Sequence, residues 1–204
     1  DNNNGGSTGN TFTDPRDGKV YKTVTIGTQV WMAENLRYLP SVVGPGTGSN
    51  TTAYYYVYGY DGTDVTAAKA TSNYATYGAL YNWTAAQTSC PTGWHLPSDA
   101  EWIELTDYLG GTNNAGGKLK EIGTTHWGSP NTGATNETGF TALPGGNRTN
   151  NGTFIFIGGS GAWWSASESS AARAWYRGMA SNYSGVYRYG YGKELGFSVR
   201  CVRD

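Results

Sequence analysis

The side chains best suited to molecular recognition gather near the end of the chain, between Trp175 and Cys201. Glycine, serine, asparagine and alanine are frequent there, together with five tyrosines: Tyr176, Tyr183, Tyr187, Tyr189 and Tyr191. Tyrosine offers a large contact area with few rotatable bonds, and the small residues offer adaptable hydrogen bonds, so this mixture is typical of antibody binding loops. The alternative is a glycine- and tyrosine-rich β-hairpin whose rings only cover a sheet.

Side chains that commonly act in catalysis or metal binding lack the spacing that such chemistry requires. His95 and His126 stand apart from each other, with no HExxH motif or cysteine cluster, so we expect structural or surface histidines. Residues 61 to 64 lack the spaced ligands of an EF-hand, so we expect a plain turn. The sequence contains no GxSxG, Walker or Rossmann motif. We therefore expect no enzyme activity and no cofactor.

The strongest helix signal covers residues 98 to 110. Ser98 is a good N-cap, Glu101 completes a capping box, and three apolar side chains share one face: Trp102, Leu105 and Leu109. Four acidic residues in this helix could form a paired-carboxylate site: Asp99, Glu101, Glu104 and Asp107. Two of them lie in the first turn, where the helix dipole favours negative charge. We therefore expect a solvated helix face there.

The two cysteines, Cys90 and Cys201, are separated by most of the chain. A bond between them would join the C-terminal strand to the start of the main helical region. Closing so long a loop would contribute about 4 kcal/mol in the chain-entropy model. Such a bond favours an exported protein, and the alternative is two buried free thiols in a cytosolic one.

Size and composition favour one loop-rich domain. Glycine accounts for 31 of the 204 residues, about twice its usual share of roughly 7%, and only 14% of residues are charged. The net charge of −1 and the interleaved C-terminal arginines offer no track for phosphates, which argues against nucleic acid. Residues 1 to 14 are rich in glycine, asparagine, serine and threonine, so we expect a flexible tether there and a folded domain over residues 15 to 204. The tether suggests a removed signal sequence, and the alternative is a frayed terminus.

Shorter sequence patterns predict the remaining strands and helices. Residues 18 to 33 predict a hairpin around Gly27 and Thr28, residues 41 to 62 predict a long loop with one strand, and residues 80 to 89 predict a short helix. From Thr124 onward, apolar pieces cut by turns predict short strands. In the last of them, the alternation of Phe197, Val199 and Cys201 with Ser198, Arg200 and Val202 predicts a strand buried on one face.

Several blocks of this sequence resemble the Fibrobacter succinogenes major paralogous domain, in that family's order. They are DGKVYKTVTIGTQVWMAENLR, YNWTAAQTSCPTGWHLPSDAEWIELTDYLGG, NETGFTALPGGNR and the C-terminal pieces GAWWSASE, AWYR and GFSVRCVRD. The resemblance covers about residues 17 to 204 and implies an exported protein of a kind widespread in Bacteroidetes-type bacteria. It implies an α+β, C-type-lectin-like fold, related to formylglycine-generating enzymes, with short helices packed on small antiparallel sheets. Cys90 and Cys201 match that fold's long structural disulfide, so we expect them to be bonded and buried.

A further resemblance concerns the tyrosine-rich segment. Some members of this family are variable proteins of diversity-generating retroelements, in which randomised adenines turn Asn codons into Tyr, Ser, Gly, Ala or Asp, but never into Trp, Met, Lys, Glu or Gln. Trp175, Met179, Lys193 and Glu194 would then be framework. The permitted residues form the expected ligand-binding surface: Tyr176, Gly178, Ala180, Ser181, Asn182, Tyr183, Ser184, Gly185, Tyr187, Tyr189, Gly190 and Tyr191. Gly192 is permitted too, and an invariant family member could also carry these residues.

The sequence departs from these related proteins in two respects, which concern sugar binding and enzymatic oxidation. The EPN, QPD and WND tripeptides of calcium-dependent sugar-binding lectins are absent. Formylglycine-generating enzymes use a pair of active-site cysteines, whereas Cys90 and Cys201 match the structural disulfide. We therefore expect neither calcium-dependent sugar binding nor enzymatic oxidation.

Two functions remain as hypotheses. The first is an exported ligand-binding protein that presents residues 173 to 192 to an unknown protein or glycan. We expect a monomer that is secreted, held at the outer membrane or cell surface by a lipidated N-terminus, or carried on a phage virion. The second is a structural or adhesive component, such as a fimbrial tip or surface-layer subunit, with the aromatic segment as its assembly interface.

Overall fold

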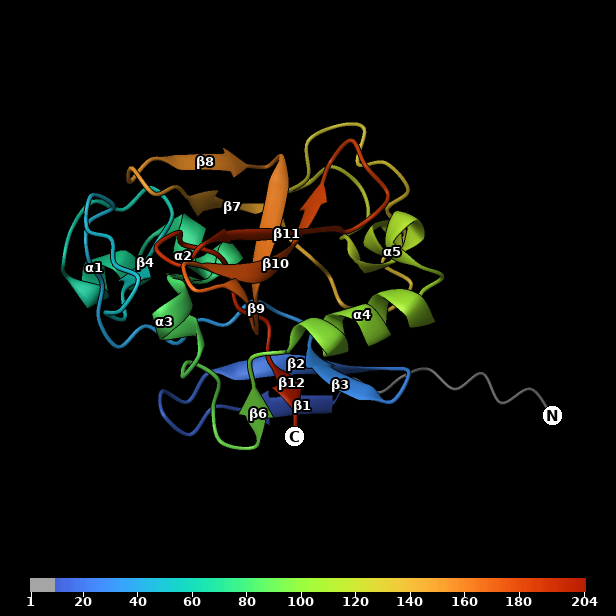
Figure 1. Ribbon diagram of the computed structural model, residues 1–204, viewed down its shortest axis with the longest axis horizontal. Helices are drawn as coiled ribbons and strands as arrows, with labels where there is room; N and C mark the ends of the chain where they lie inside the picture. The colour runs from blue at the N-terminus through green and yellow to red at the C-terminus, as the bar shows by residue number, and fades with distance from the viewer. Residues whose placement is uncertain (1–9) are drawn as a thin grey trace.

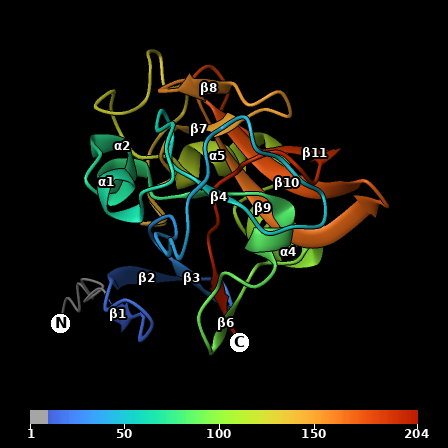
Figure 2. The ribbon, with the colours of Figure 1, turned by 90° about the vertical axis from the view of Figure 1, so that its left-hand side faces the viewer.

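Two curled sheets organise the computed structural model of the chain, which describes residues 10 to 204 (Figure 1). The first sheet has the strand order β1-β2-β3-β12-β6. Its strands are β1 (Asn10–Thr13), β2 (Val20–Ile26), β3 (Gln29–Met32), β12 (Val202–Arg203) and β6 (Trp94–His95). Figure 2 shows this sheet beneath the rest of the fold, as Figure 1 does.

The second sheet has the order β11-β10-β9-β7-β8, so β11 and β8 are its edge strands. Its members are β7 (Gly145–Arg148), β8 (Phe154–Ile157), β9 (Ser160–Ser170), β10 (Arg173–Ala180) and β11 (Tyr187–Gly192). The pairing of β7 with β9 is parallel, whereas the expected sheets were antiparallel throughout. In Figure 1, β7 and β8 lie above β10 and β11, and β9 connects the two pairs.

Short helices and a two-stranded ladder surround the sheets. The ladder pairs β4 (Tyr55–Tyr56) with β5 (Leu80–Tyr81). The helices are α1 (Val65–Lys69), α2 (Ser72–Tyr77), α3 (Trp83–Ala86), α4 (Asp99–Tyr108) and α5 (Thr112–Leu119). The expected class of mixed helix and sheet is therefore confirmed, with strands predominating and helices kept short.

The two strongest sequence signals are confirmed. The hairpin forms from β2 and β3, and Gly27 adopts the positive φ of 62° that its turn requires. Helix α4 begins after Ser98, whose side chain accepts from the amide of Glu101, and the reciprocal half of the capping box is also present.

Three expectations need correction. Residues 80 to 89 form β5 and then the short α3, because Asn82 caps a new helix instead of continuing one. Residues 124 to 143, for which short strands were expected, form turns and loops. The expected tether of residues 1 to 14 is partly folded: Asn10–Thr13 pair with β2 as β1, and Asp14 is buried. The rest of the tether lies outside the described residues.

The segment from Phe197 to Val202 is buried on both faces, and not on one face as its alternation predicted. Every residue in it is at most 3% exposed, and only Val202 belongs to a strand, β12. Isolated bridges link the segment to Tyr81 on one side and to Trp163 on the other. It therefore runs through the interior, where Ser198 and Arg200 are enclosed together with the apolar residues.

Strand β9 supplies both halves of the hydrophobic core. Consecutive strand residues point to opposite faces. Trp164 packs with Phe197, Val199 and Cys201, while Trp163 packs with a second cluster that includes Met179. Both indoles are fully buried, and both donate hydrogen bonds, Trp163 to Asn35 Oδ1 at 2.8 Å and Trp164 to the carbonyl of Tyr81 at 2.8 Å.

Three fully buried cations hold the loops by donating to backbone carbonyls. Lys120 donates to three carbonyls, Arg148 donates to those of Pro45, Thr47 and Glu194, and Arg200 donates to that of Phe140 among others. Within residues 10 to 204, none of the three forms an ion pair with a carboxylate. The carbonyls replace the water that burial removes, so each cation joins chain segments that no sheet joins.

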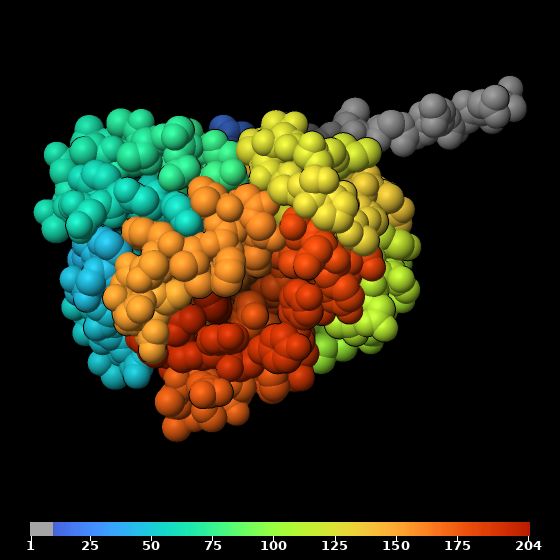
Figure 3. All heavy atoms as spheres, turned by 90° about the horizontal axis from the view of Figure 1, so that it is seen from above, coloured from blue at the N-terminus to red at the C-terminus, as the bar shows by residue number. Residues whose placement is uncertain are grey.

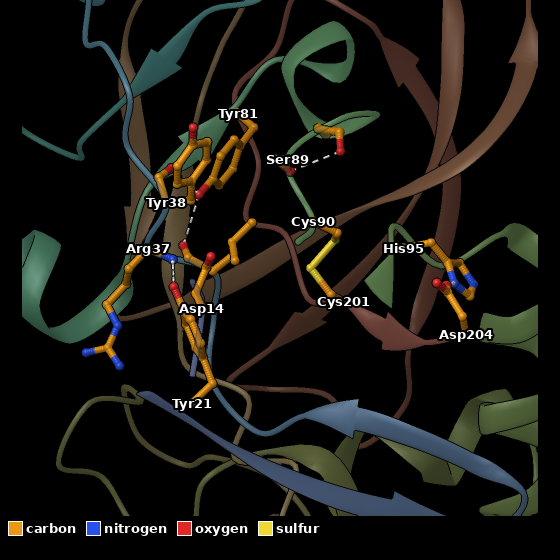
Figure 4. Close-up of a disulfide and its surroundings, with 12 residues drawn as sticks. Asp14, Tyr21, Arg37, Tyr38, Tyr81, Ser89, Cys90, His95, Cys201 and Asp204 are labelled. Atoms are coloured by element: carbon orange, nitrogen blue, oxygen red, sulfur yellow. Dashed lines mark hydrogen bonds and ion pairs between the residues drawn. A yellow bond between two sulfur atoms is a disulfide. The ribbon is translucent and has the colours of Figure 1, made fainter. Parts of the chain in front are cut away.

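The expected disulfide is confirmed between Cys90 and Cys201 (Figure 4). It links the turn after α3 to the C-terminal segment, 111 residues away in sequence. Cys201 is fully buried, whereas Cys90 is only partly buried, so the expectation that both would be buried holds for one of them.

Candidate functional site

The tyrosine-rich segment folds as an antiparallel ribbon of β10 and β11. Tyr176 lies opposite Tyr189, and Gly178 lies opposite Tyr187. Because side chains alternate along a strand and opposite residues share a face, Tyr176, Tyr187, Tyr189 and Tyr191 lie on one face of the ribbon. The pair Arg177 and Arg188 lies on the other face.

The arginine face is fixed to helix α4 through Asp99. Arg177, which is buried, contacts Asp99 Oδ1 at 2.9 Å, and Arg188 binds the same carboxylate with two hydrogen bonds of 2.9 and 2.8 Å. The Arg188 guanidinium also lies 3.6 Å from the ring centre of Trp175. Burial raises the pKa of Asp99, but the hydrogen bonds from Arg188 and Arg177 outweigh it and leave the pKa lowered.

This anchoring corrects the expectation of a solvated acidic helix face. Asp99 holds the ribbon, and Glu101 accepts from Ser98 and contacts His95. Glu104 and Asp107 are exposed, as expected. The anchoring residues could not be paired from sequence, because Asp99 and Arg188 are 89 residues apart.

The tyrosine face carries a row of stacked rings. Tyr183 and Tyr187 stack with ring centres 4.8 Å apart, and Tyr187 and Tyr189 stack at 6.1 Å. Tyr189 and Tyr191 are the most exposed of the five, at 55% and 46%. The Tyr183 hydroxyl donates to Asn113 Oδ1 at 3.0 Å, which fixes one end of the row to α5.

Tyr176 has a different role from the other tyrosines. Its ring packs 4.9 Å from that of Phe197 and stands almost perpendicular to that of Tyr191 at 5.3 Å. Burial raises its pKa to about 12. Tyr176 is therefore both part of the core and the floor of the tyrosine face.

The loop between the two strands is fixed to α5. The Lys120 ammonium donates to the carbonyls of Ala180 and Tyr183 at 2.9 Å each and to that of Thr132 at 3.0 Å. The amide of Val186 donates to the carbonyl of Thr112 at 2.7 Å. Burial lowers the pKa of Lys120 to about 8. The loop therefore has defined positions for its ends.

Not every expected ligand-binding residue reaches the surface. Asn182 is exposed, and Ala180, Ser181, Ser184 and Gly190 are half-buried. Gly178 and Gly185 are buried, and a Cβ on Gly185 would lie 2.6 Å from the carbonyl oxygen of Thr112. These two glycines permit close packing, and they add no side chain to a binding surface.

A groove of about 1020 Å³ opens beside the tyrosine face (Figure 3). It lies between β7 and β8 on one side and the β10–β11 ribbon on the other. Four expected residues line it: Tyr176, Tyr189, Gly190 and Tyr191. Tyr183 and Tyr187 lie outside it. The structure therefore divides the expected surface into a groove and an adjoining row of stacked rings.

Sequence reasoning missed the other side of this groove. Its lining there includes Asn50, Asn147, Asn150 and Phe156, and Arg173 and Glu194 lie near the ribbon. The residues Thr149 to Gly152 carried only a turn signal. Their place opposite β11 depends on the curl of the sheet, which no local pattern reveals.

The two histidines are held by carboxylates. His95 Nδ1 lies 2.6 Å from Asp204 Oδ1, and its Nε2 lies 2.7 Å from Glu101 Oε1. His126 Nδ1 lies 2.8 Å from Glu121 Oε2. Among residues 10 to 204, no group of three or more histidine, cysteine or acidic side chains is placed to hold a metal ion. Asp64, in the expected plain turn, caps α1 by accepting from two amides.

Together, the curled sheet, the ribbon and the groove place an exposed aromatic surface at one edge of a mixed fold. The family model of the Fibrobacter succinogenes major domain matches residues 24 to 203. The chain therefore belongs to the Fibrobacter succinogenes major domain family. No curated protein and no solved structure matches the chain significantly. Across the described part of the chain, no helix is long and apolar enough to cross a membrane.

Proposed function

We propose that this protein binds a ligand through the tyrosine face of the β10–β11 ribbon and does not catalyse a reaction. The observation that carries the proposal is the division of the ribbon into two faces. Asp99 fixes the arginine face to α4, while Tyr189 and Tyr191 stay exposed on the other face. A rigid ribbon that exposes aromatic side chains loses little entropy when a partner binds.

The proposal has two further parts, which are diversification of the segment by a retroelement and a C-type-lectin-like scaffold. The arrangement of the segment supports both. Met179 and Lys193, which randomised Asn codons cannot encode, are buried, and Lys193 binds Glu168 at 2.6 Å. Asn182, Tyr189 and Tyr191, which those codons do encode, are exposed. A template copy of the 3′ coding region beside a reverse transcriptase, differing from it at adenines, tests this. A genome without such a copy refutes diversification and leaves ligand binding untouched.

Export to a cell surface or virion and a monomeric state complete the proposal. The Cys90–Cys201 disulfide supports export, because such bonds persist in oxidising compartments. Fractionation of the native host tests the location. Recovery of the protein with the reduced cytosolic fraction would contradict it.

The binding surface is tested with fluorescently labelled protein on a panel of bacterial and epithelial cells. We expect saturable binding of the wild type. The double variant Tyr189→Thr/Tyr191→Thr should bind with an affinity lower by about tenfold or more, because central aromatic residues dominate interface energies. Threonine keeps the strand propensity of the ribbon. Tyr108→Gln is the matched control, since Tyr108 is 67% exposed but lies on α4. Binding that the double variant retains in full would contradict the proposal.

A second function, assembly with copies of itself, is favoured by one observation. Strand β11 is an edge strand, and edge strands present unpaired backbone groups that add to other sheets. Light scattering over a wide concentration range separates the two functions. A monomer at every concentration excludes self-assembly, and concentration-dependent growth would favour it over ligand binding.

A further inference from the structure

The groove beside the ribbon has an aromatic floor and an aromatic wall. Tyr176 packs on Phe197, and the plane of Tyr191 stands at 79° to that of Tyr176, so the rings form a corner. Phe156 of β8 lines the groove on the opposite side and is 63% exposed. Its φ of 66° is costly for a residue with a side chain, so the fold holds an apolar ring in solvent at a conformational cost.

Three neutral amides with free hydrogen-bonding capacity line the groove. Within residues 10 to 204, the side chains of Asn50, Asn147 and Asn150 make no hydrogen bond in the structure, although all three line the groove. The buried Asn82, in contrast, is fully engaged: its side chain bonds to the backbone of Ser49, Thr52, Tyr54 and Ala85. An amide offers both donors and an acceptor, so each of the three free amides can bond to a hydroxyl group of a ligand.

The charges that line the groove are balanced. Arg173 and Glu194 are its two charged residues, and they have opposite signs. A site for an acidic ligand would carry several cations, as carboxylate and phosphate sites do. The volume of about 1020 Å³ is at the upper end of the roughly 300–1,000 Å³ that drug-sized ligands occupy, so it suits several linked rings better than one.

From this combination we infer that the groove binds a neutral oligosaccharide. The apolar C–H face of a sugar ring packs on the negative face of an aromatic ring, and its hydroxyls bond to amides. The inference rests on the proposed function, because it makes the groove the pocket of that binding surface. A peptide that adds as a strand to the edge of β8 or β11 is the competing occupant, and selective binding of peptides is one outcome of the test below.

Screening the protein on an array of neutral and acidic glycans, followed by calorimetric titration with the best neutral oligosaccharide, tests the inference. We expect binding to neutral glycans, with Asn147→Ala and Tyr191→Ala each weakening the affinity by about tenfold or more. Tyr108→Ala is the matched control, because Tyr108 is 67% exposed but lies on α4, outside the groove. It should leave the affinity unchanged.

Phe156→Gly separates binding from folding. Glycine adopts a positive φ without strain, so this variant should melt at the wild-type temperature or above it. It should nevertheless bind the sugar about tenfold more weakly, because the ring of the groove wall is lost.

The outcomes distinguish this inference from the proposed function. Cell binding that depends on Tyr189 and Tyr191 without binding of any neutral glycan would overturn the sugar inference alone. Selective binding of acidic glycans or of peptides in the groove would do the same, as would sugar binding that the groove variants leave unchanged. A protein that binds neither cells nor glycans would overturn the sugar inference and the proposed function together.

Discussion

At Gly185, a single added methyl group decides whether the loop between β10 and β11 can pack. A Cβ there would lie 2.5 Å from the ring of Tyr183 and 2.6 Å from the carbonyl oxygen of Thr112. We expect Gly185→Ala to lower the free energy of unfolding by about 1–3 kcal/mol, because backbone must move to admit the methyl group. Chemical denaturation measures this. Gly46→Ala is the control, since no atom lies within 4 Å of its added Cβ. Equal stabilities for both variants would contradict the close packing of the loop.

His95 makes stability depend on pH. Burial lowers its pKa, but the hydrogen bonds to Asp204 and Glu101 outweigh this and raise the pKa above 6.5. A raised pKa stabilises the folded state fully below the unfolded value of about 6.5, and the stabilisation is lost as pH rises through the folded value. We expect at most about 1 kcal/mol, because solvent screens this half-exposed cluster.

The measurement is the difference in free energy of unfolding between the wild type and His95→Gln at pH 6 and at pH 9. The wild-type advantage should be larger at the lower pH. An advantage that grows with pH would contradict the assigned contacts with Asp204 and Glu101.

At the scale of elements, Lys120 links α5 to the loop that joins β10 and β11. Replacing it with methionine keeps the volume but removes the donor from three partly buried carbonyls, those of Thr132, Ala180 and Tyr183. We expect Lys120→Met to cost about 2–4 kcal/mol and to speed amide exchange over residues 181 to 186. Lys118→Met is the control, because Lys118 lies in the last turn of α5, two residues before Lys120, but pairs with Glu137 at the surface. Unchanged exchange in that loop would show that Lys120 does not hold it.

Elements with a complete local signal were predicted, and those shaped by distant contacts were not. Helix α4 has its cap, its apolar face and its terminating glycines in its own sequence. Helix α5 includes Gly116 and Gly117, which disfavour a helix by about 1 kcal/mol each relative to alanine. The structure explains them, because a Cβ on either would overlap a backbone carbonyl, of Gly185 and of Gly133 respectively.

The same distinction holds for the candidate site. Composition located the tyrosine-rich segment, and the structure then placed Tyr187, Tyr189 and Tyr191 on one face of a ribbon. The anchor at Asp99 and the amides across the groove depend on chain segments far away in sequence, so they required the three-dimensional structure. The interior path of residues 197 to 202 was misjudged for the same reason, since its second covered face comes from distant strands.

At the scale of the whole molecule, the Cys90–Cys201 bond ties the interior segment to the turn after α3. We expect the variant Cys90→Ala/Cys201→Ala to lose about 2–5 kcal/mol of unfolding free energy, because the unfolded chain gains freedom when a loop of 111 residues opens. Urea denaturation of both proteins measures the difference. The exchange of residues 176 to 192 should also accelerate, since the segment that follows them loses its link. A variant as stable as the wild type would show that the bond adds nothing to the scaffold.

We propose that a fixed scaffold displays an exchangeable tyrosine surface. The free energy of unfolding of Tyr189→Thr/Tyr191→Thr, compared with that of Tyr176→Thr, tests it most directly. We expect the double variant to stay within about 1 kcal/mol of the wild type, because about half of each ring is exposed. Tyr176→Thr should lose about 2–4 kcal/mol, because its ring packs on Phe197. A loss of several kcal/mol in the double variant would show that these rings belong to the core and would contradict the claim.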